Sequence, residues 1–165
     1  MEKRIDRLKA ELRKLGFVTT ETEDREWLSF TYSDLTFRFT VDEEQDFMAM
    51  GLAFYQEHSD VERGRILEVI NRVNDRINYA KVIEIGDVFW LTYEVDVERR
   101  MPDGEDIRNM IMTLTGAYYH LTSVYAEVAG LPDLVQEEEK EGTSPGAFDW
   151  DGYVSDGKGG DNDDD

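Results

Sequence analysis

Residues 66–97, ILEVINRVNDRINYAKVIEIGDVFWLTYEVDV, contain the change of hydrophobic period that decides the fold. In the first half, apolar residues recur at i, i+4, i+7 and i+11, which predicts a helix over about 61–78. The residues of this stripe are Ile66, Ile70, Val73 and Ile77. The second half is rich in β-branched and aromatic residues and predicts strands over 80–85 and 88–97. The connection Gly86-Asp87 has a leading glycine, as a type II′ hairpin turn requires, so this stretch predicts a helix followed by a β-hairpin.

Upstream of this stretch the sequence predicts one helix and a four-stranded meander. A narrow apolar stripe ends at Leu15, and Gly16 stands where a left-handed C-terminal cap would form, which predicts a helix over about 2–15. Segments rich in aromatic and β-branched residues follow, separated by short polar turns, and are expected to be antiparallel strands. These segments are 17–22, 27–32, 35–41 and 47–55.

Downstream of the hairpin, a long apolar stripe predicts the last helix, which Gly130 and Pro132 end. Ser59 and Glu62 have the spacing of a capping box for the middle helix. The predicted element order is αββββαββα. We therefore expect an α+β fold in which an antiparallel sheet packs against helices.

The composition changes after this body, and we place the boundary between residues 131 and 132. Residues 132–165 hold 12 of the 38 acidic residues, only two of the 18 basic ones, and many glycines. Such a segment buries too little apolar surface to offset its ordering entropy, so we predict a disordered acidic tail after a single domain, 1–131.

The formal net charge of −20 repels nucleic-acid phosphates and anionic lipid headgroups, so neither is an expected partner, whereas a basic protein partner is favoured. The N-terminus has no continuous apolar segment and no later run is long enough to span a membrane. The chain has no cysteine, which excludes disulfides and thiolate chemistry. A cytoplasmic location is the simplest expectation.

Two glycine- and aspartate-rich motifs in the tail fail as ligand sites. Residues 152–158 have the spacing of a phosphate-binding loop up to its lysine, but Gly159 replaces the required Ser or Thr. A calcium loop counted from Asp149 breaks at Val154, where a glycine is needed. No cofactor and no metal site is predicted.

No catalytic residue is predicted either. Glu94, Asp96 and Glu98 share one strand face, yet nothing visible would split their pKa values for acid–base work, so a solvated sheet face is expected. Neither histidine lies in a nucleophile pattern, and we expect a surface role for His58 and a packing role for His120.

Two features point instead to binding. The strand 47–55 is apolar on both faces: either the chain's own helices or tail cover it, or one face docks a second subunit or a partner. The docking face would present Met48, Met50 and Leu52, or else Phe47 and Tyr55. In the tail, Phe148, Trp150 and Tyr153 are aromatic residues in a segment expected to be disordered; they form a lid on the domain, a motif for a partner, or a chance cluster.

The element order, together with Ile70-Asn71-Arg72-Val73-Asn74, Lys81-Val82 and residues 88–94 after the Gly86-Asp87 turn, resembles the YbjN-type proteins. The resemblance covers about residues 1–130 and implies the fold of the type III secretion chaperones. It also implies a small acidic protein, chaperone-like or regulatory, that works through protein contacts and is commonly dimeric. The tail departs from this family's compact plan.

The sequence therefore favours a non-enzymatic interaction protein that holds a partner polypeptide or a second copy of itself. The alternative is a regulator that responds to a cation or small ligand through its acidic tail.

Overall fold

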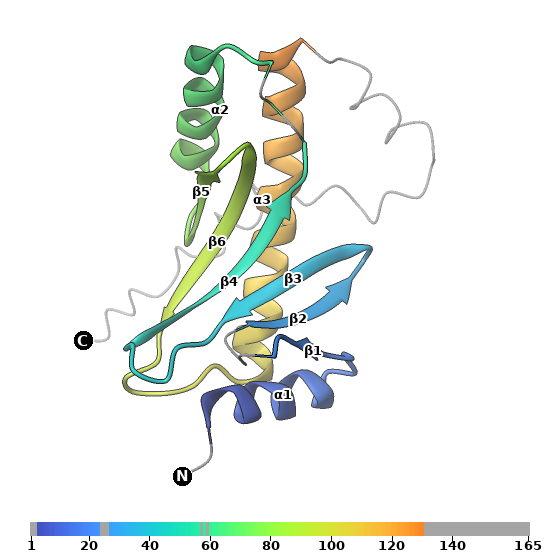
Figure 1. The fold of residues 1–165 in the computed structure, drawn as a ribbon, viewed down its shortest axis with the longest axis vertical. Coiled ribbons are helices and arrows are strands. Elements are labelled where there is room, and N and C mark those ends of the chain that lie inside the picture. Colours follow the sequence, from blue (N-terminus) through green and yellow to red (C-terminus); the bar gives the residue numbers. More distant parts are fainter. Residues whose placement is uncertain (1–2, 24–26, 57, 59, 131–165) are drawn as a thin grey trace, which may run out of the picture.

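The computed structural model describes residues 3–23, 27–56, 58 and 60–130, and it has the predicted α+β fold and element order (Figure 1). The helices are α1 (Arg4–Lys14), α2 (Arg63–Arg76) and α3 (Gly104–Ala129). The strands are β1 (Thr20–Glu21), β2 (Trp27–Tyr32), β3 (Leu35–Thr40), β4 (Phe47–Phe54), β5 (Ala80–Ile85) and β6 (Val88–Asp96). The predicted order αββββαββα is confirmed, while the predicted tail lies outside the described residues.

The six strands form one antiparallel sheet in the order β1-β2-β3-β4-β6-β5. The last hairpin joins the meander through its second strand, so β6 lies against β4 along eight residue pairs, from Phe47↔Asp96 to Phe54↔Phe89. Strand β5 is therefore left at the edge of the sheet. This order decides which backbone groups remain open to a partner.

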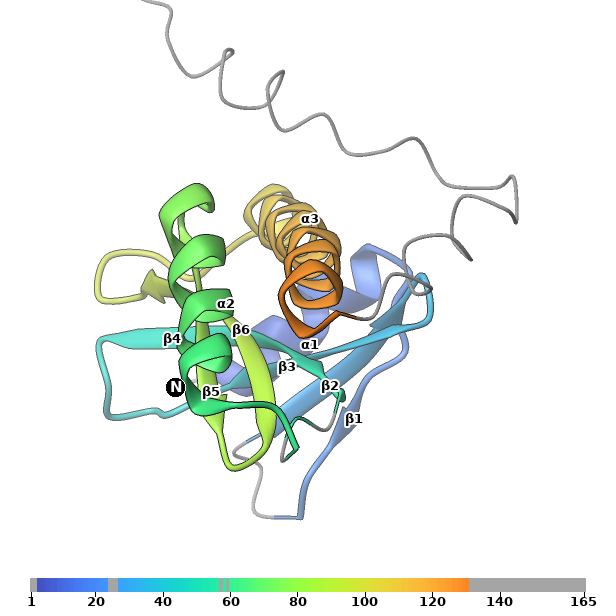
Figure 2. The same ribbon diagram turned by 90° about the horizontal axis from the view of Figure 1, so that it is seen from above.

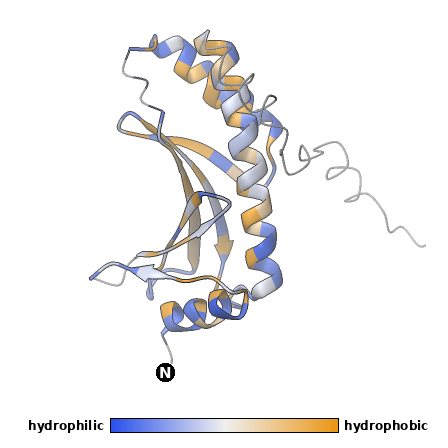
Figure 3. Ribbon diagram, turned by 90° about the vertical axis from the view of Figure 1, so that its right-hand side faces the viewer, coloured by the Kyte–Doolittle hydropathy of each residue, from blue (hydrophilic) through white to orange (hydrophobic). Residues whose placement is uncertain are grey.

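The helices lie over one face of the sheet, as the view in Figure 2 shows for α2 and α3. Figure 3 shows α3 running along one side of the curved sheet, whereas the other side carries no described helix. We call the helix-covered side the inner face and the opposite side the outer face. The inner face supplies much of the core, including Leu28, Phe30, Phe37, Phe39, Met48, Met50, Leu52, Phe89 and Leu91.

Two local predictions about backbone geometry are confirmed. Gly16 has φ +87°, and the N–H of Phe17 bonds the carbonyl of Leu12 at 3.0 Å, the bond that closes a left-handed helix cap. This turn brings Phe17 onto the core, with its ring 4.8 Å from that of Phe30. In the last hairpin, Gly86 has φ +62° and Asp87 does not have a left-handed φ, as expected for a type II′ turn.

The helix starts differ from the prediction. Helix α2 begins at Arg63 with Glu62 as its N-cap and without a side-chain cap bond, so Glu62 does not hold the third helical position that the predicted capping box needs. Ser59 lies outside the described residues. A capping box occurs instead at α3, where Asp103 accepts the backbone N–H of Glu105 and Asp106, and Asp106 accepts that of Asp103.

The predicted first strand, 17–22, is also shorter than expected, since only Thr20 and Glu21 pair with β2.

Among the described helices, none has the length and apolar character needed to cross a membrane.

Candidate partner-binding surfaces

The predicted contact residues of β4 lie in the core. Met48, Met50 and Leu52 are 2%, 0% and 1% exposed, because they point to the inner face, where the chain's own helices pack. This corrects the expectation that they dock a partner and supports the alternative, that the chain itself covers this face. Phe148, Trp150 and Tyr153 lie outside the described residues, so their docking stays a prediction.

The outer face of β4 is lined by small residues and is crossed by a tryptophan of β6. Gly51 pairs with Thr92, next to Trp90 on β6, and a Cβ built on Gly51 would lie 3.3 Å from Cε3 of Trp90. The missing side chain thus makes room for the indole ring to lie close to β4. Sequence patterning marks Gly51 only as a weak strand residue and gives no sign of this contact.

On the outer face, Trp90 belongs to a stack of three residues with Arg38 and Trp27. The guanidinium carbon of Arg38 lies 5.1 Å from the ring centroid of Trp27 and 5.7 Å from that of Trp90. Both distances are within the range of cation–π attraction. The three residues come from β2, β3 and β6, so the stack forms only in this strand register. It holds two large rings in fixed positions on the face that no described helix covers.

Beside this stack, exposed apolar side chains gather at the end of the sheet where β5 and β6 turn. Ile83 pairs with Trp90 and Ile85 with Val88, so these four side chains adjoin on one face. Ile83 and Ile85 are 40% and 58% exposed, and Tyr55, just after β4, is 72% exposed. We define the outer apolar patch as Tyr55, Ile83, Ile85, Val88 and Trp90. Phe47 and Tyr55, the other predicted docking residues of this strand, are both exposed on this outer side, and their contact with a partner stays a prediction.

The sequence contains a signal for this patch. Strand β5 has apolar residues on both sides, since Val82 points into the core while Ile83 and Ile85 do not. An edge strand with two apolar faces is unusual unless something covers the second one. Without the strand order, however, β5 could equally have been a central strand.

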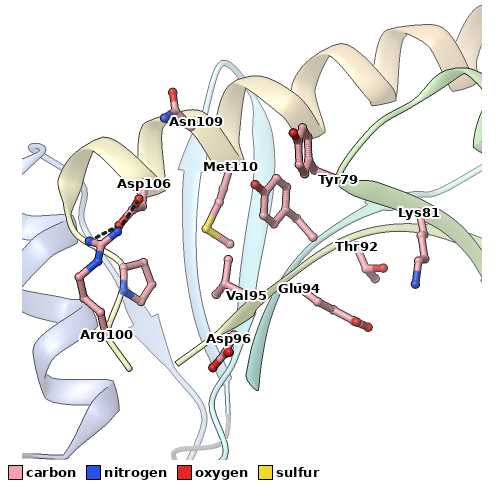
Figure 4. Close-up of a pocket in the computed structure, with 12 residues that line it drawn as sticks. Tyr79, Lys81, Thr92, Glu94, Val95, Asp96, Arg100, Asp106, Asn109 and Met110 are labelled. Carbon is pink, nitrogen blue, oxygen red and sulfur yellow. Dashed lines mark hydrogen bonds and ion pairs between the residues drawn. The ribbon is translucent and has the colours of Figure 1, made fainter. Parts of the chain in front are cut away.

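A hollow separate from this patch, which we call the edge groove, lies between the free end of β6 and the first half of α3 (Figure 4). It encloses about 460 Å³. Figure 4 shows Met110 of α3 pointing toward Val95, whereas Glu94 and Asp96 point to the other side of β6. The lining residues are Tyr79, Lys81, Thr92, Tyr93, Glu94, Val95, Asp96, Arg100, Pro102, Asp106, Asn109 and Met110.

One wall of the edge groove is a closed ion-pair cluster. Arg100 donates to both carboxylate oxygens of Asp106, at 2.6 and 3.1 Å, and to Asp103 at 2.9 Å. The hydrogen bonds from Arg100 lower the pKa of Asp106 below its usual 3.8. The charge of Arg100 is thus balanced within the α3 cap. Glu94 has no ion pair with any described residue, and it carries a negative charge toward the outer side of the groove.

His58 is held in place by packing and hydrogen bonds within the described part of the chain. His58 was expected at the surface but is 3% exposed, because its ring stacks on Phe89 with centroids 4.4 Å apart. Its Nε2 lies 3.0 Å from Glu84 and its Nδ1 3.4 Å from the carbonyl of Gln56. Arg63 also bonds Glu84. Both ring nitrogens are engaged, and the contacts tie the start of α2 to β5.

Glu94 and Asp96 are exposed on the outer face, as expected for a solvated strand face. No group of three or more His, Asp or Glu among the described residues could hold a metal ion. The carboxylates of residues 132–165, on which the cation-sensing alternative depends, are not among them.

Comparisons with known proteins give a family and a fold. Residues 4–116 match the YbjN family, described as "Putative bacterial sensory transduction regulator". The structure titled "Crystal structure of YbjN, a putative transcription regulator from E. coli" has a TM-score of 0.52 and 14% identity, over 76% of this chain and 93% of that one. The structure titled "Structure of the HopA1-SchA Chaperone-Effector Complex" has a TM-score of 0.47 and 9% identity, over 66% and 84%. No curated protein matches the sequence.

Proposed function

The chain belongs to the YbjN family, and from that premise we propose that it is a non-enzymatic protein that acts by binding a partner polypeptide on its outer apolar patch. The observation that carries the proposal is the exposure of Tyr55, Ile83 and Ile85 on a face without a described helix. Contiguous apolar side chains at a protein surface mark sites of protein contact more often than isolated ones do.

The stack of Trp27, Arg38 and Trp90 extends this surface along the sheet. Tryptophan and arginine are the residue types that most often dominate binding energy at protein interfaces. Because their rings and guanidinium group are already held in place, a partner would lose little side-chain entropy in ordering them. The proposed contact therefore has an apolar centre with one fixed cation beside it.

This contact fits a chaperone-like or regulatory adaptor, since either role requires a surface that binds another polypeptide. A second copy of the chain is the alternative occupant of the same patch. Two copies would have to approach against a net charge of −20 each. For this reason we favour a different, less acidic partner.

Site-specific photo-cross-linking tests the proposal. A benzoylphenylalanine at Ile85 is expected to give discrete cross-linked products in cells, whereas the same group at Val18, which is 88% exposed in the connection between α1 and β1, gives none. The substitution Ile83→Asp should abolish the products, while Val18→Asp, the same chemical change elsewhere, should not.

Equal cross-linking at both positions, or none at Ile85, would count against the patch as the binding surface. Irradiation of the purified protein identifies self-association, because a product of twice the chain mass would then appear without other proteins.

A further inference from the structure

We propose that the edge groove is a second binding site, which takes an extended peptide segment with alternating basic and apolar side chains as an added strand next to β6. This inference goes beyond the outer apolar patch, because it uses other residues and the backbone of the sheet. It rests on an open length of strand edge, a groove beside it and the charges that face the groove.

The open edge arises because β6 is longer than its neighbour. Strand β6 runs to Asp96, but β5 begins at Ala80, which pairs with Tyr93. Residues 94–96 therefore pair with β4 on one side and with no described strand on the other. Tyr79, just before β5, has φ +64°, a left-handed conformation that is strained for an aromatic residue. This kink takes the chain away from the edge and leaves it open.

The hydrogen-bond pattern shows which backbone groups face the open side. The side chain of Asn74 bonds both the N–H and the carbonyl of Val82, at 2.7 and 3.0 Å, so these groups point away from β6. In an antiparallel ladder the direction of the backbone N–H and carbonyl groups alternates from residue to residue. The backbone groups of Lys81 and of its partner Thr92 therefore point toward each other. Two residues further along, the backbone groups of Glu94 and then Asp96 point to the same side, where no described strand lies.

The N–H of Val97 bonds the carbonyl of Asp46 at 2.8 Å. This bond confirms that the backbone N–H and carbonyl groups of the odd-numbered residues in this segment point toward β4. An incoming strand would therefore exchange hydrogen bonds with Glu94 and Asp96. By contrast, Asn74 already occupies the backbone of Val82 on the outermost strand. The described edge is thus occupied at Val82 of β5 and unpaired at the end of β6.

The side chains of the groove determine what the added strand must carry. On the α3 side, Met110 and Val95 offer an apolar floor (Figure 4). On the outer side, Glu94 and Asp96 are exposed carboxylates, and Arg100 is already balanced by Asp103 and Asp106. Opposite charges directly across two strands attract, so the residues that pair with Glu94 and Asp96 should be Lys or Arg. The intervening residues should be apolar.

Two further residues limit the site at its β5 end. The ring of Tyr79 is 74% exposed and lies parallel to that of Tyr93, with centroids 6.3 Å apart, which forms an aromatic wall. Lys81 on the outer face adjoins Thr92, and its charge disfavours a basic side chain at that end. Favourable charge pairs are thus expected only at the two ligand positions opposite Glu94 and Asp96.

Binding of a synthetic peptide to the full chain tests this site. Fluorescence anisotropy with a labelled Lys-Val octapeptide, (Lys-Val)4, should show saturable binding, and the Glu-Val counterpart should show none. The double variant Glu94→Lys/Asp96→Lys should weaken binding at least tenfold. Each of the single variants Glu94→Lys and Glu98→Lys changes the net charge equally, but only the first should weaken binding, because Glu98 is exposed outside the groove.

Methylation of the peptide backbone distinguishes strand pairing from simple charge attraction. The lysines that face Glu94 and Asp96 on the outer side are also the residues whose N–H groups point to β6. N-methylation of every lysine should therefore abolish binding, whereas N-methylation of every valine, at the same mass and charge, should leave it within about twofold.

The proposal is overturned if both methylated peptides bind alike, if Glu98→Lys weakens binding as much as Glu94→Lys, or if the full chain does not bind (Lys-Val)4 at all. The last result is also expected if the chain's own acidic tail or a second copy already fills the edge. None of these outcomes bears on the cross-link at Ile85, so the groove and the patch are tested separately.

Discussion

At the scale of single residues, His120 shows how packing restricts an ionisable group. It lies on α3, and its Nε2 is buried without a hydrogen-bond partner among the described residues. Burial lowers the pKa of His120 below its usual 6.5, and the nearby positive charges of Arg76 and Arg72 on α2 lower it further. The folded state therefore favours the neutral ring, in agreement with the predicted packing role.

This lowered pKa predicts a pH dependence of stability. Well above pH 6.5 the ring is neutral in both states, and its effect is constant. As the pH falls below 6.5, the unfolded chain takes up a proton first, so the free energy of unfolding decreases until the folded-state pKa is passed. Urea denaturation between pH 5 and 8 should show this decrease, and His120→Gln should remove it.

A second pH window provides an internal control for that variant. Hydrogen bonds from Arg63 and then His58 lower the pKa of Glu84 below 4.5, so the folded state loses stability as the pH falls below that value. His120→Gln should leave this acid loss unchanged, which urea denaturation extended down to pH 3 measures. If the variant flattens neither window, or both equally, the assignment to His120 is wrong.

At the scale of elements, the start of α3 depends on one side chain. Asp103 accepts two backbone N–H groups of the first turn, at 2.9 and 3.1 Å, and pairs with Arg100. The carboxylate also lies at the positive end of the helix dipole. Asp103→Ala should therefore reduce the free energy of unfolding by about 1 kcal/mol, measured by urea denaturation.

The control is Asp103→Asn, which keeps an acceptor for the backbone N–H groups but removes the charge. It should retain most of the stability, because asparagine is also a good N-cap residue. A loss from Asn as large as that from Ala would show that the ion pair with Arg100, and not the cap, stabilises this helix end.

The predicted elements show what a single sequence can determine. The helix and hairpin of residues 66–97 are found because the change from a helical to a twofold period is local, and the Gly86 turn fixes the hairpin register. The cap at α3 escaped detection because it pairs two aspartates instead of the usual Ser or Thr with Glu.

The candidate sites depend on tertiary arrangement, which the pattern does not contain. The apolar character of β4 on both faces is visible in the sequence, but the face that the helices cover is not. The sequence therefore could not show that Met48 is buried and Tyr55 exposed. Arg38 meets Trp27 and Trp90 only because β2, β3, β4 and β6 lie in this order. The edge groove likewise requires β5 to be outermost and shorter than β6.

At the scale of the whole molecule, charge opposes compactness. The chain has 38 acidic and 18 basic residues, and bringing them together in a folded state raises their mutual repulsion. Raising the salt concentration from 0.01 to 0.1 M shortens the screening length from about 30 to about 10 Å. The melting temperature should therefore increase with NaCl, by on the order of 3 °C if about 1 kcal/mol of repulsion is removed.

Calorimetry over a NaCl series measures this effect. Screening predicts a rise that levels off once the screening length falls to a few ångströms, near 1 M salt. A rise that continues linearly at higher concentration would indicate exclusion of the salt from the protein surface, and a melting temperature independent of NaCl would contradict the repulsion.

The short open length of β6 also affects how the protein behaves at high concentration. Fibril formation needs segments of about six or seven residues that stack on identical copies of themselves. Within the described part of the chain, the unpaired edge of β6 spans residues 94–96, two of them negatively charged, and Asn74 occupies the neighbouring edge at Val82. Copies of the chain stacked in register would bring Glu94 and Asp96 onto like charges. The opening is thus long enough for a short ligand and too short and too acidic to seed amyloid.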